Sequence, residues 1–539
     1  MKKIKAGFAA VAVLVFAVCS INPVPEEKNL SNTVLTGQVV QVEDTVVTLD
    51  LGELTWLQTP ETAADEVRSH EGVPLNGMNS QQAAQNTAAQ TFVSWEQGAV
   101  LDLSGAQVFT VTAGQAEPAV LQDVLPQDFV SVAVDGDNLA AVVTILASDE
   151  QERAEPEALQ GTAANTIKED HSERGAEYRS VSDDENALRV ASATVNLRNV
   201  RVEKSDGITS NSYGSNHYGL NATLLATGGA QLTLSNGIVN SSASSGNGVF
   251  SHGAGTMVYL NGGAVTTTGD GAGGVQTAGG AGVYAKGATI ITAGDAAAVI
   301  RACSGGSGVQ LEGGTYTSGG YESPVIYAAG AVNARNAAFT ANNSQAVVVE
   351  GSGSAVLENC DVTGKMSGTQ ADEEVCTVAI FSHVELPENK QGRFSMSGGS
   401  LTSRSGDIFH VTDAVCTIEL KNVTVNNEGE GALLRVVSED ESRAASVSLT
   451  AQKQKLSGNI LVDSTSALQL ELTDGSRYTG AVQRTDQRTE TSGDITVHVS
   501  QGCTWSLTGN SVVDTLDNEG TIQYNGYSIT LADGTVLTA

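Results

Sequence analysis

The chain is poor in aromatic, proline and basic residues. Its 539 residues include 4% aromatic side chains, 9 prolines and 28 Lys and Arg against 61 Asp and Glu, so the net charge is -33 at pH 7. This excess of negative charge repels nucleic acids and anionic membrane surfaces. We therefore expect no nucleic-acid partner, and contact with a membrane only through a lipid anchor. A chain of this length also exceeds what one compact core organises, which indicates several domains or a repeat array.

Cysteine is scarce as well, with 6 in the whole chain. Apart from Cys19 the cysteines are odd in number and none forms a CxxC pair, which indicates neither a disulfide framework nor a zinc site. Several replace the Val or Ala of neighbouring repeats, so we expect buried free thiols. These five are Cys303, Cys360, Cys376, Cys416 and Cys503.

Several motifs of catalysis and cofactor binding are missing. The sequence has no GxSxG elbow, no phosphate-binding glycine loop, no calcium-binding nonapeptide and no pair of histidines at metal-ligand spacing. It therefore indicates no cofactor and no metal site. The acidity is explained by solubility in an extracellular setting, and weak Ca²⁺ binding is the one metal interaction that it suggests.

Long apolar runs are absent except near the N-terminus. Lysines within the first five residues precede an apolar run over 6–18, which is too short to span a membrane and is typical of a secretory signal. We predict a signal peptide over 1–25 and an extracellular or cell-envelope location. Cys19 stands where a lipoprotein signal places its lipidated cysteine, but the preceding Phe16-Ala17-Val18 is a poor version of the usual box. Lipidation at Cys19 and ordinary cleavage nearby both stay open.

What the sequence does contain is a repeat. A short apolar phrase recurs about every 22–26 residues between Phe250 and Val349, and each phrase is followed by a turn with Asn or Gly at its third position. These two residue types enter the left-handed backbone region most easily, so their column predicts the same bend in every repeat. The turn residues are Asn199, Asn236, Gly262, Gly287, Gly313, Asn336, Asn359, Gly398 and Asn422.

The segments between the bends are short, alternating and rich in Val, Thr, Ile and Ala, which indicates strands. Strands with one bend per repeat and no helices between them predict a parallel β-helix, and the handedness of parallel connections makes it right-handed. The predicted fold class is therefore all-β, with this solenoid preceded by a small β-barrel-like domain.

The alternation also gives each position a direction. One position stays apolar and is predicted to face the core: Leu188, Leu224, Val249, Val275, Ile300, Ile326, Val348, Ile380, Phe409 and Leu434. The next position varies in chemistry and is predicted to form an outward stripe: Arg189, Leu225, Phe250, Gln276, Arg301, Tyr327, Val349, Phe381, His410 and Arg435.

Composition divides the chain into parts. Residues 31–148 contain two predicted hairpins, one around the turn at Glu43-Asp44 and one over 128–146, which suggest an open barrel of five or six strands. A charged linker over 149–162 follows, and residues 163–539 form the β-helix with capping coils at its C-terminal end. Excursions leave two of the repeats, one over 206–219 and one over 368–376 together with 383–392, and in solenoids such insertions often carry binding functions.

The outward stripe is the main candidate for a site. Aromatic faces stack on sugar rings, and Arg side chains bind carboxylates and sulfates. We predict that a glycan or other surface ligand binds at Phe250, Gln276, Arg301, Tyr327, Phe381, His410 and Arg435. The alternative is that these side chains form an ordinary surface.

Enzymatic alternatives also stay open. Parallel β-helices carry many polysaccharide lyases and hydrolases, which need clustered acidic calcium ligands or paired carboxylates. The acidic groups here, at Asp183-Asp184-Glu185, Asp372-Glu373-Glu374 and Glu439-Asp440-Glu441, fall in turns and excursions. We identify no catalytic residue. A structural envelope spacer with no soluble ligand is the third hypothesis, and the oligomeric state is open.

Residues 163–539 resemble the adhesin-like, right-handed β-helix surface proteins of gut-dwelling anaerobic bacteria. The segments that carry the resemblance include Gly246-Asn247-Gly248-Val249-Phe250-Ser251, Gly313-Gly314-Thr315-Tyr316-Thr317 and the stretch from Asn525 to Leu537. The resemblance implies a secreted or lipid-anchored envelope protein and supplies no catalytic residues. The word adhesin in this setting is itself an analogy from fold.

Overall fold

The computed structural model describes residues 33–43, 46–56, 90–103, 106–112, 115–119, 121, 124, 128–134, 140–146, 160–210, 212–303, 307–366, 375–382, 390–439, 444–485 and 493–539. The predicted signal peptide with Cys19, and most of the predicted linker, lie outside these residues. The chain divides into two compact units, one of residues 1–62 and 84–155 and one of residues 63–83 and 156–539. In the described part no helix is long and apolar enough to cross a membrane.

The N-terminal unit is built on one seven-stranded sheet, with strand order β3-β2-β1-β6-β7-β4-β5. Both predicted hairpins are present, because β1 pairs antiparallel with β2 and β6 pairs antiparallel with β7. The sheet therefore has seven strands instead of the five or six expected. The strands are β1 (Thr33–Glu43), β2 (Val46–Trp56), β3 (Gln90–Asp102), β4 (Gln107–Thr112), β5 (Gln115–Ala119), β6 (Phe129–Val134) and β7 (Ala140–Leu146).

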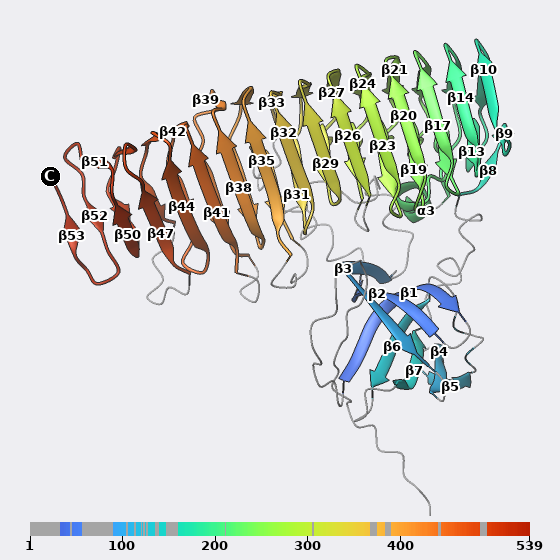
Figure 1. Cartoon of the computed structure of the whole chain (residues 1–539), viewed down its shortest axis with the longest axis horizontal. Helices are drawn as coiled ribbons and strands as arrows, with labels where there is room; N and C mark the ends of the chain where they lie inside the picture. Colours follow the sequence, from blue (N-terminus) through green and yellow to red (C-terminus); the bar gives the residue numbers. More distant parts are fainter. Residues whose placement is uncertain are drawn as a thin grey trace, which may run out of the picture. The chain divides into compact units, whose positions relative to one another are not determined.

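The second unit is a right-handed parallel β-solenoid of about 13 turns, which confirms the predicted fold class. Successive turns stack as rows of parallel arrows (Figure 1). Three sheets run along it, and a typical turn adds one short strand to each of them. With neighbouring strands about 4.8 Å apart, the solenoid is about 60 Å long.

The first side of the solenoid is a 14-stranded sheet. Its strands are β10 (His171–Arg174), β14 (Thr194–Arg198), β17 (Gln231–Ser235), β20 (Met257–Asn261), β23 (Gly282–Lys286), β26 (Gly308–Glu312), β29 (Ala331–Arg335), β32 (Ser354–Glu358), β35 (Gly392–Ser397), β38 (Val415–Lys421), β41 (Ser446–Gln452), β44 (Ala467–Thr473), β47 (Ile495–Val499) and β50 (Thr515–Asn518).

The second side is a 10-stranded sheet, followed along the chain by a separate four-stranded sheet. The ten strands are β11 (Glu177–Ser180), β15 (Arg201–Lys204), β18 (Ile238–Ser241), β21 (Ala264–Thr267), β24 (Thr289–Thr292), β27 (Thr315–Ser318), β30 (Ala338–Ala341), β33 (Asp361–Gly364), β36 (Ser400–Ser403) and β39 (Thr424–Asn427). The four are β42 (Lys455–Ser457), β45 (Arg477–Thr479), β48 (Thr504–Ser506) and β51 (Thr521–Gln523).

The third side is a 13-stranded sheet. Its strands are β9 (Thr166–Ile167), β13 (Leu188–Ala191), β16 (Leu224–Thr227), β19 (Val249–His252), β22 (Val275–Ala278), β25 (Ile300–Ala302), β28 (Ile326–Ala328), β31 (Val347–Glu350), β34 (Cys376–Phe381), β37 (Asp407–Thr412), β40 (Leu434–Val437), β43 (Ile460–Val462) and β46 (Val482–Arg484).

Short elements complete the two ends of the solenoid. At its start β8 (Thr162–Ala163) pairs with β12 (Glu185–Asn186). At the C-terminal end β49 (Ser511–Val512) pairs with β52 (Ile529–Thr530), which turns back antiparallel against β53 (Val536–Leu537). This antiparallel pair interrupts the parallel stacking.

The turn between the 14-stranded and 10-stranded sheets repeats as predicted. All nine Asn and Gly residues of the predicted column have positive φ, between 50° at Asn236 and 67° at Gly398. Each also donates its backbone N–H to a carbonyl oxygen of the next turn; for example, Asn336 N lies 2.9 Å from Glu358 O. The bend and the stacking of turns are therefore made by the same residue.

Identical positions of successive turns pair directly, and this creates apolar columns inside the solenoid. On the 13-stranded sheet the inner column begins Leu188, Leu224, Val249, Val275, Ile300 and Ile326. These side chains have no exposed surface. The five described cysteines are all buried and free, which confirms their prediction as small apolar groups.

We expect the turn column to respond to substitution by backbone conformation alone. Asn336→Ala places a Cβ-bearing residue without a polar side chain at φ 55°, which should cost about 1 kcal/mol of stability. Asn336→Gly should be tolerated. Hydrogen exchange of the adjoining turns measures the difference, because each turn contacts chiefly its neighbours. Equal protection in the two variants would contradict this explanation of the column.

Candidate functional site

The predicted ligand-binding residues lie on the outer side of the 13-stranded sheet. Six of them belong to one column of paired positions that runs Arg189, Leu225, Phe250, Gln276, Arg301, Tyr327, Val348, Ala379, His410 and Arg435. Phe381 lies on the same strand as Ala379, two residues further along. The structure therefore brings the predicted set together on one side of one sheet.

The expectation that this stripe is an open surface is wrong. The exposed fractions are 0% for Phe250, 2% for Gln276, 8% for Arg301, 1% for Tyr327, 6% for Phe381 and 4% for His410. The Arg435 side chain, at 33%, is the partly exposed member. Alternation correctly places these side chains outside the core, but other parts of the chain cover them. Ligand binding at these residues stays an untested prediction.

One position in the predicted columns is also shifted. Val348 was expected inside and Val349 outside, whereas Tyr327 pairs with Val348 and Val349 belongs to the main core. The segment Ala346-Val347-Val348-Val349 is uniformly apolar and buried, so alternation cannot identify its inner face. A shift of one residue exchanges the two faces of a strand.

The excursion over 206–219 supplies part of the cover. It contains the helix α3 (Ser212–His217), and Ala222, just beyond it, packs with Leu225, Phe250, Ala278 and Cys303 in a small apolar cluster. Gly219 lies so close that a Cβ there would stand 2.7 Å from Leu225 Cδ1. An insertion predicted to carry binding functions thus folds back onto the column.

A polar network ties this excursion to the sheet. Gln276 Nε2 donates to the carbonyl oxygen of Asn216 at 2.5 Å, and Arg301 Nη1 lies 3.5 Å from Asn216 Oδ1. The Arg301 guanidinium lies over the Tyr327 ring, 4.9 Å from its centroid, and the Tyr327 hydroxyl donates to Glu350 Oε2 at 2.5 Å. Arg301 therefore contacts both the excursion and the Tyr327 ring.

Arg435 has a comparable internal partner. Its Nε donates to Asp407 Oδ2 at 2.7 Å, and Asp407 Oδ1 accepts the backbone N–H of Ala432 at 2.6 Å. His410 Nδ1 lies 3.9 Å from the same carboxylate, and Asp407 itself is 6% exposed. This group links strands β37 and β40 across adjacent turns. Sequence reasoning missed Asp407, which starts a strand and has no distinguishing motif.

The acidic turn Asp183–Glu185 has a structural role as well. Asp183 and Asp184 each accept a backbone N–H from the excursion, at Ile208 and Ser210. The fully buried Lys204 donates to the carbonyl oxygen of Ser182 at 2.7 Å. Burial lowers the pKa of Lys204, while Glu185 and its acidic neighbours oppose this effect. A buried lysine was not predicted from the sequence.

Two histidines lie at the contact between the excursion and the sheet. The ring of His252 lies 4.9 Å from the Tyr218 ring, and its Nδ1 is 3.2 Å from Gln160 Nε2. Burial lowers the pKa of His252 to about 4. Burial, with Arg301 and His252 adding to it, lowers the pKa of His217 to about 3. Both imidazoles are neutral while the cover is closed.

The cover should therefore loosen in mild acid. The opened form binds more protons than the closed form once the pH falls below the 6.5 of a free imidazole, so stability is full above that pH and is lost toward about pH 4. Hydrogen exchange of residues 212–222, corrected for intrinsic rates, should be faster at about pH 5 than at about pH 7.5. The double variant His217→Gln, His252→Gln should lose this pH dependence. Unchanged protection of the native chain across this range would contradict the assignment.

The outer side of the 14-stranded sheet, which we call the long face, carries two partly exposed tyrosines, Tyr259 and Tyr284. Tyr259 and Tyr284 are paired on adjacent strands, and Gln310 and Asn333 continue the same column. In these strands the outward positions are partly or fully exposed, in alternation with buried ones. Beside Tyr284 and Gln310 the next outward column carries Gly282 and Gly308, and the Met257 side chain of the same column lies over Gly282.

A ladder of opposite charges borders this column. Glu312 lies between Lys286 and Arg335, with N–O distances of 3.1 and 3.0 Å, and it accepts the Tyr284 hydroxyl at 2.5 Å. These hydrogen bonds, that of Tyr284 first, lower the pKa of Glu312 to about 2. The ionised Glu312 carboxylate therefore orients Tyr284 through the hydrogen bond from the Tyr284 hydroxyl.

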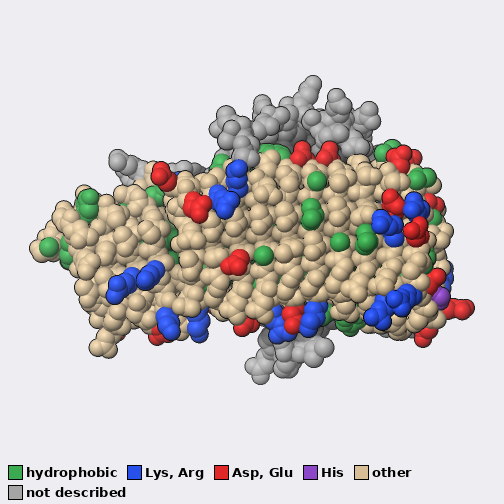
Figure 2. Space-filling model, turned by 90° about the horizontal axis from the view of Figure 1, so that it is seen from above, with side chains coloured by type: hydrophobic (Ala, Val, Ile, Leu, Met, Phe, Trp, Pro, Cys, Tyr) green, Lys and Arg blue, Asp and Glu red, His purple; other side chains and the backbone are tan. Residues whose placement is uncertain are grey.

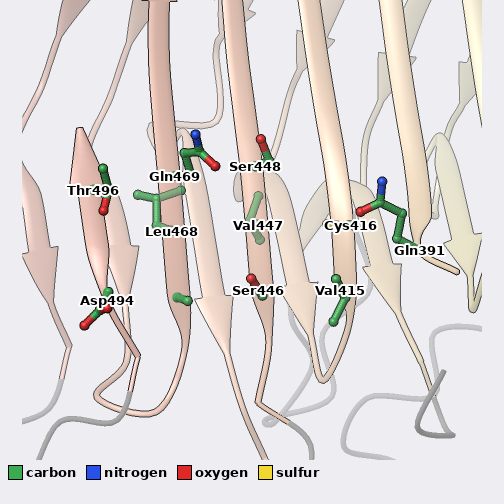
Figure 3. Close-up of a pocket in the computed structure, with 11 residues that line it drawn as sticks. Gln391, Val415, Cys416, Ser446, Val447, Ser448, Leu468, Gln469, Asp494 and Thr496 are labelled. Carbon is green, nitrogen blue, oxygen red and sulfur yellow. The ribbon is translucent and has the colours of Figure 1, made fainter. Parts of the chain in front are cut away.

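The long face also contains a hollow of about 190 Å³ over strands β38 to β47. Ser446 and Ala467 are paired, and their small side chains leave space for the hollow. Ser448, Gln469 and Thr496 form a polar row next to them. Figure 3 shows this row across adjacent strands, with Gln391 and Asp494 toward opposite ends. Hydroxyl and amide groups at successive strands can hydrogen-bond an extended polar ligand.

Nothing in the described residues forms a metal centre, since no group of three or more His, Cys, Asp or Glu is close enough together. Weak Ca²⁺ binding stays a prediction. The acidic segments Asp372-Glu373-Glu374 and Glu439-Asp440-Glu441 lie largely outside the described residues, as does most of the excursion over 368–376 and 383–392.

No family model matches the chain, and no curated protein matches its sequence.

Proposed function

We propose that the chain is a non-enzymatic, secreted or surface-anchored β-helix protein that binds an extended glycan along the long face. The observation that carries this proposal is that the paired, partly exposed Tyr259 and Tyr284 stand in register with the amide side chains of Gln310 and Asn333. The predicted export signal and the resemblance to adhesin-like envelope proteins support the location.

The chemistry of the long face suits a neutral or mildly polar sugar chain. Aromatic faces receive the apolar face of a sugar ring, while Gln310 and Asn333 offer amide donors and acceptors at neighbouring strands. The charges of the border are already paired within the ladder, and the chain as a whole is strongly negative. A strongly anionic polymer is therefore a poorer fit than a neutral one.

This proposal moves the site from the covered stripe to the long face. In the covered stripe Phe250, Arg301 and Tyr327 contact other parts of the solenoid and the excursion. A ligand there would have to displace those contacts, whereas the rings of the long face adjoin solvent.

The test is a glycan and mucin array with the full chain. The double variant Tyr259→Ala, Tyr284→Ala should lower the affinity about tenfold or more, because both stacking surfaces are lost. Tyr259→Phe, Tyr284→Phe should retain binding, since it keeps the rings and removes the hydroxyl bond to Glu312. Circular dichroism and thermal unfolding check that each variant keeps its fold.

Other outcomes distinguish the remaining hypotheses. If the folded native chain binds no glycan on the array, the proposal is contradicted and a structural spacer is favoured. Binding that survives in the alanine variant would place the site elsewhere. Unsaturated or reducing-end products from incubated polysaccharides would identify a lyase or hydrolase instead.

A further inference from the structure

The outer side of the 10-stranded sheet carries few charged side chains over most of its length. From β18 to β39 its outward positions are Ile238, Asn240, Ala264, Thr266, Thr289, Ile291, Thr315, Thr317, Ala338, Thr340, Asp361, Thr363, Ser400, Thr402, Thr424 and Asn426. Half of these residues are threonine, and Asp361 is the one charged residue among the positions named. We call this surface the threonine face.

The single carboxylate of the threonine face is partly satisfied within it. Asp361 accepts a hydrogen bond from the Ser400 hydroxyl at 2.6 Å. Charged side chains return just before β18, where Arg179 and Glu203 form an ion pair at 3.3 Å. In Figure 1 several strands of this sheet are labelled along the upper edge, and Figure 2, the view from above, shows broad areas without charged side chains.

This lack of charge is unusual for a chain with a net charge of -33. Two copies that meet through surfaces rich in carboxylates bring like charges together, which is unfavourable. The threonine face is where two copies can meet with little repulsion. It also carries two of the large apolar side chains that are substantially exposed, Ile238 at 38% and Ile291 at 39%.

The regularity of the face points to the same partner. Asn240, Thr266, Ile291, Thr317, Thr340, Thr363, Thr402 and Asn426 are paired strand to strand in one column. Their methyl and hydroxyl groups therefore recur at the strand spacing of about 4.8 Å. A second copy of the face has the same repeat, so the two can interdigitate turn by turn as stacked sheets do.

We propose that the threonine face is a self-association surface that receives the same face of a second copy of this chain. Eight strands about 4.8 Å apart, each with four residues of about 3.3 Å, give about 500 Å² per copy. The total of about 1,000 Å² is near the lower limit for specific association. We therefore expect a weak, reversible dimer, formed more readily when added salt screens the net charge.

The experiment is sedimentation equilibrium of the full chain over a range of protein and salt concentrations. The variant Thr317→Glu, Thr340→Glu places like charges in the centre of the contact and should weaken self-association at least about tenfold. The matched control is Gln310→Glu, Asn333→Glu, which adds the same charge in the same turns on the long face. The control should associate like the native chain.

Each other outcome overturns the proposal. A native chain that stays monomeric at all concentrations and salt levels has no such contact. Association that persists in the threonine-face variant uses another surface. Equal loss in both variants would show that total charge, and not the threonine face, governs association. A second measurement is crosslinking through the introduced thiol of Thr317→Cys in a Cys19→Ser background, which should join two copies, while Gln310→Cys in the same background should not.

Discussion

The backbone hydrogen bonds between successive turns are the interaction on which the rest of the solenoid depends. They fix each residue beside its equivalent in the next turn, as in the pairing of Val249 with Val275 and of Val275 with Ile300. Side chains at equivalent positions of successive turns therefore form a column, in which neighbours are about 4.8 Å apart. Packing, charge and exposure are consequently properties of columns and not of single residues.

This constraint gives the solenoid three sides with different chemistry. On the 13-stranded sheet, Arg301 and Tyr327 are used internally under the excursion that contains α3. On the 14-stranded sheet, Tyr284 and the ladder around Glu312 are open to solvent. From β18 to β39 the outer side of the 10-stranded sheet is nearly without charge. In our proposals, one side of the solenoid contacts its own chain, one binds a polar ligand and one binds a second copy.

The sequence predicted the solenoid because its signals are local and repeated. The Asn and Gly column and the inner apolar column are each readable from spacing, and the structure confirms both. It did not predict the cover, because the contact of Asn216 with Gln276 and Arg301 joins residues about 60 to 85 positions apart in the chain. Alternation also could not show whether Val348 or Val349 faces the core, because every residue of the segment 346–349 is apolar. The long face was overlooked because Tyr259 and Tyr284 do not belong to the apolar phrase that defined the repeat.

The central claim is that the long-face tyrosines are partly exposed while the aromatic side chains of the stripe are buried, and hydroxyl-radical footprinting of the full chain with mass spectrometry tests it most directly. We predict that Tyr259 and Tyr284 are oxidised readily, while Phe250 and Tyr327, at 0% and 1% exposure, are protected. Oxidation of Phe250 and Tyr327 at rates equal to those of the two long-face tyrosines would contradict the account. In that case the stripe of the 13-stranded sheet would be open and would again be the leading candidate for the ligand.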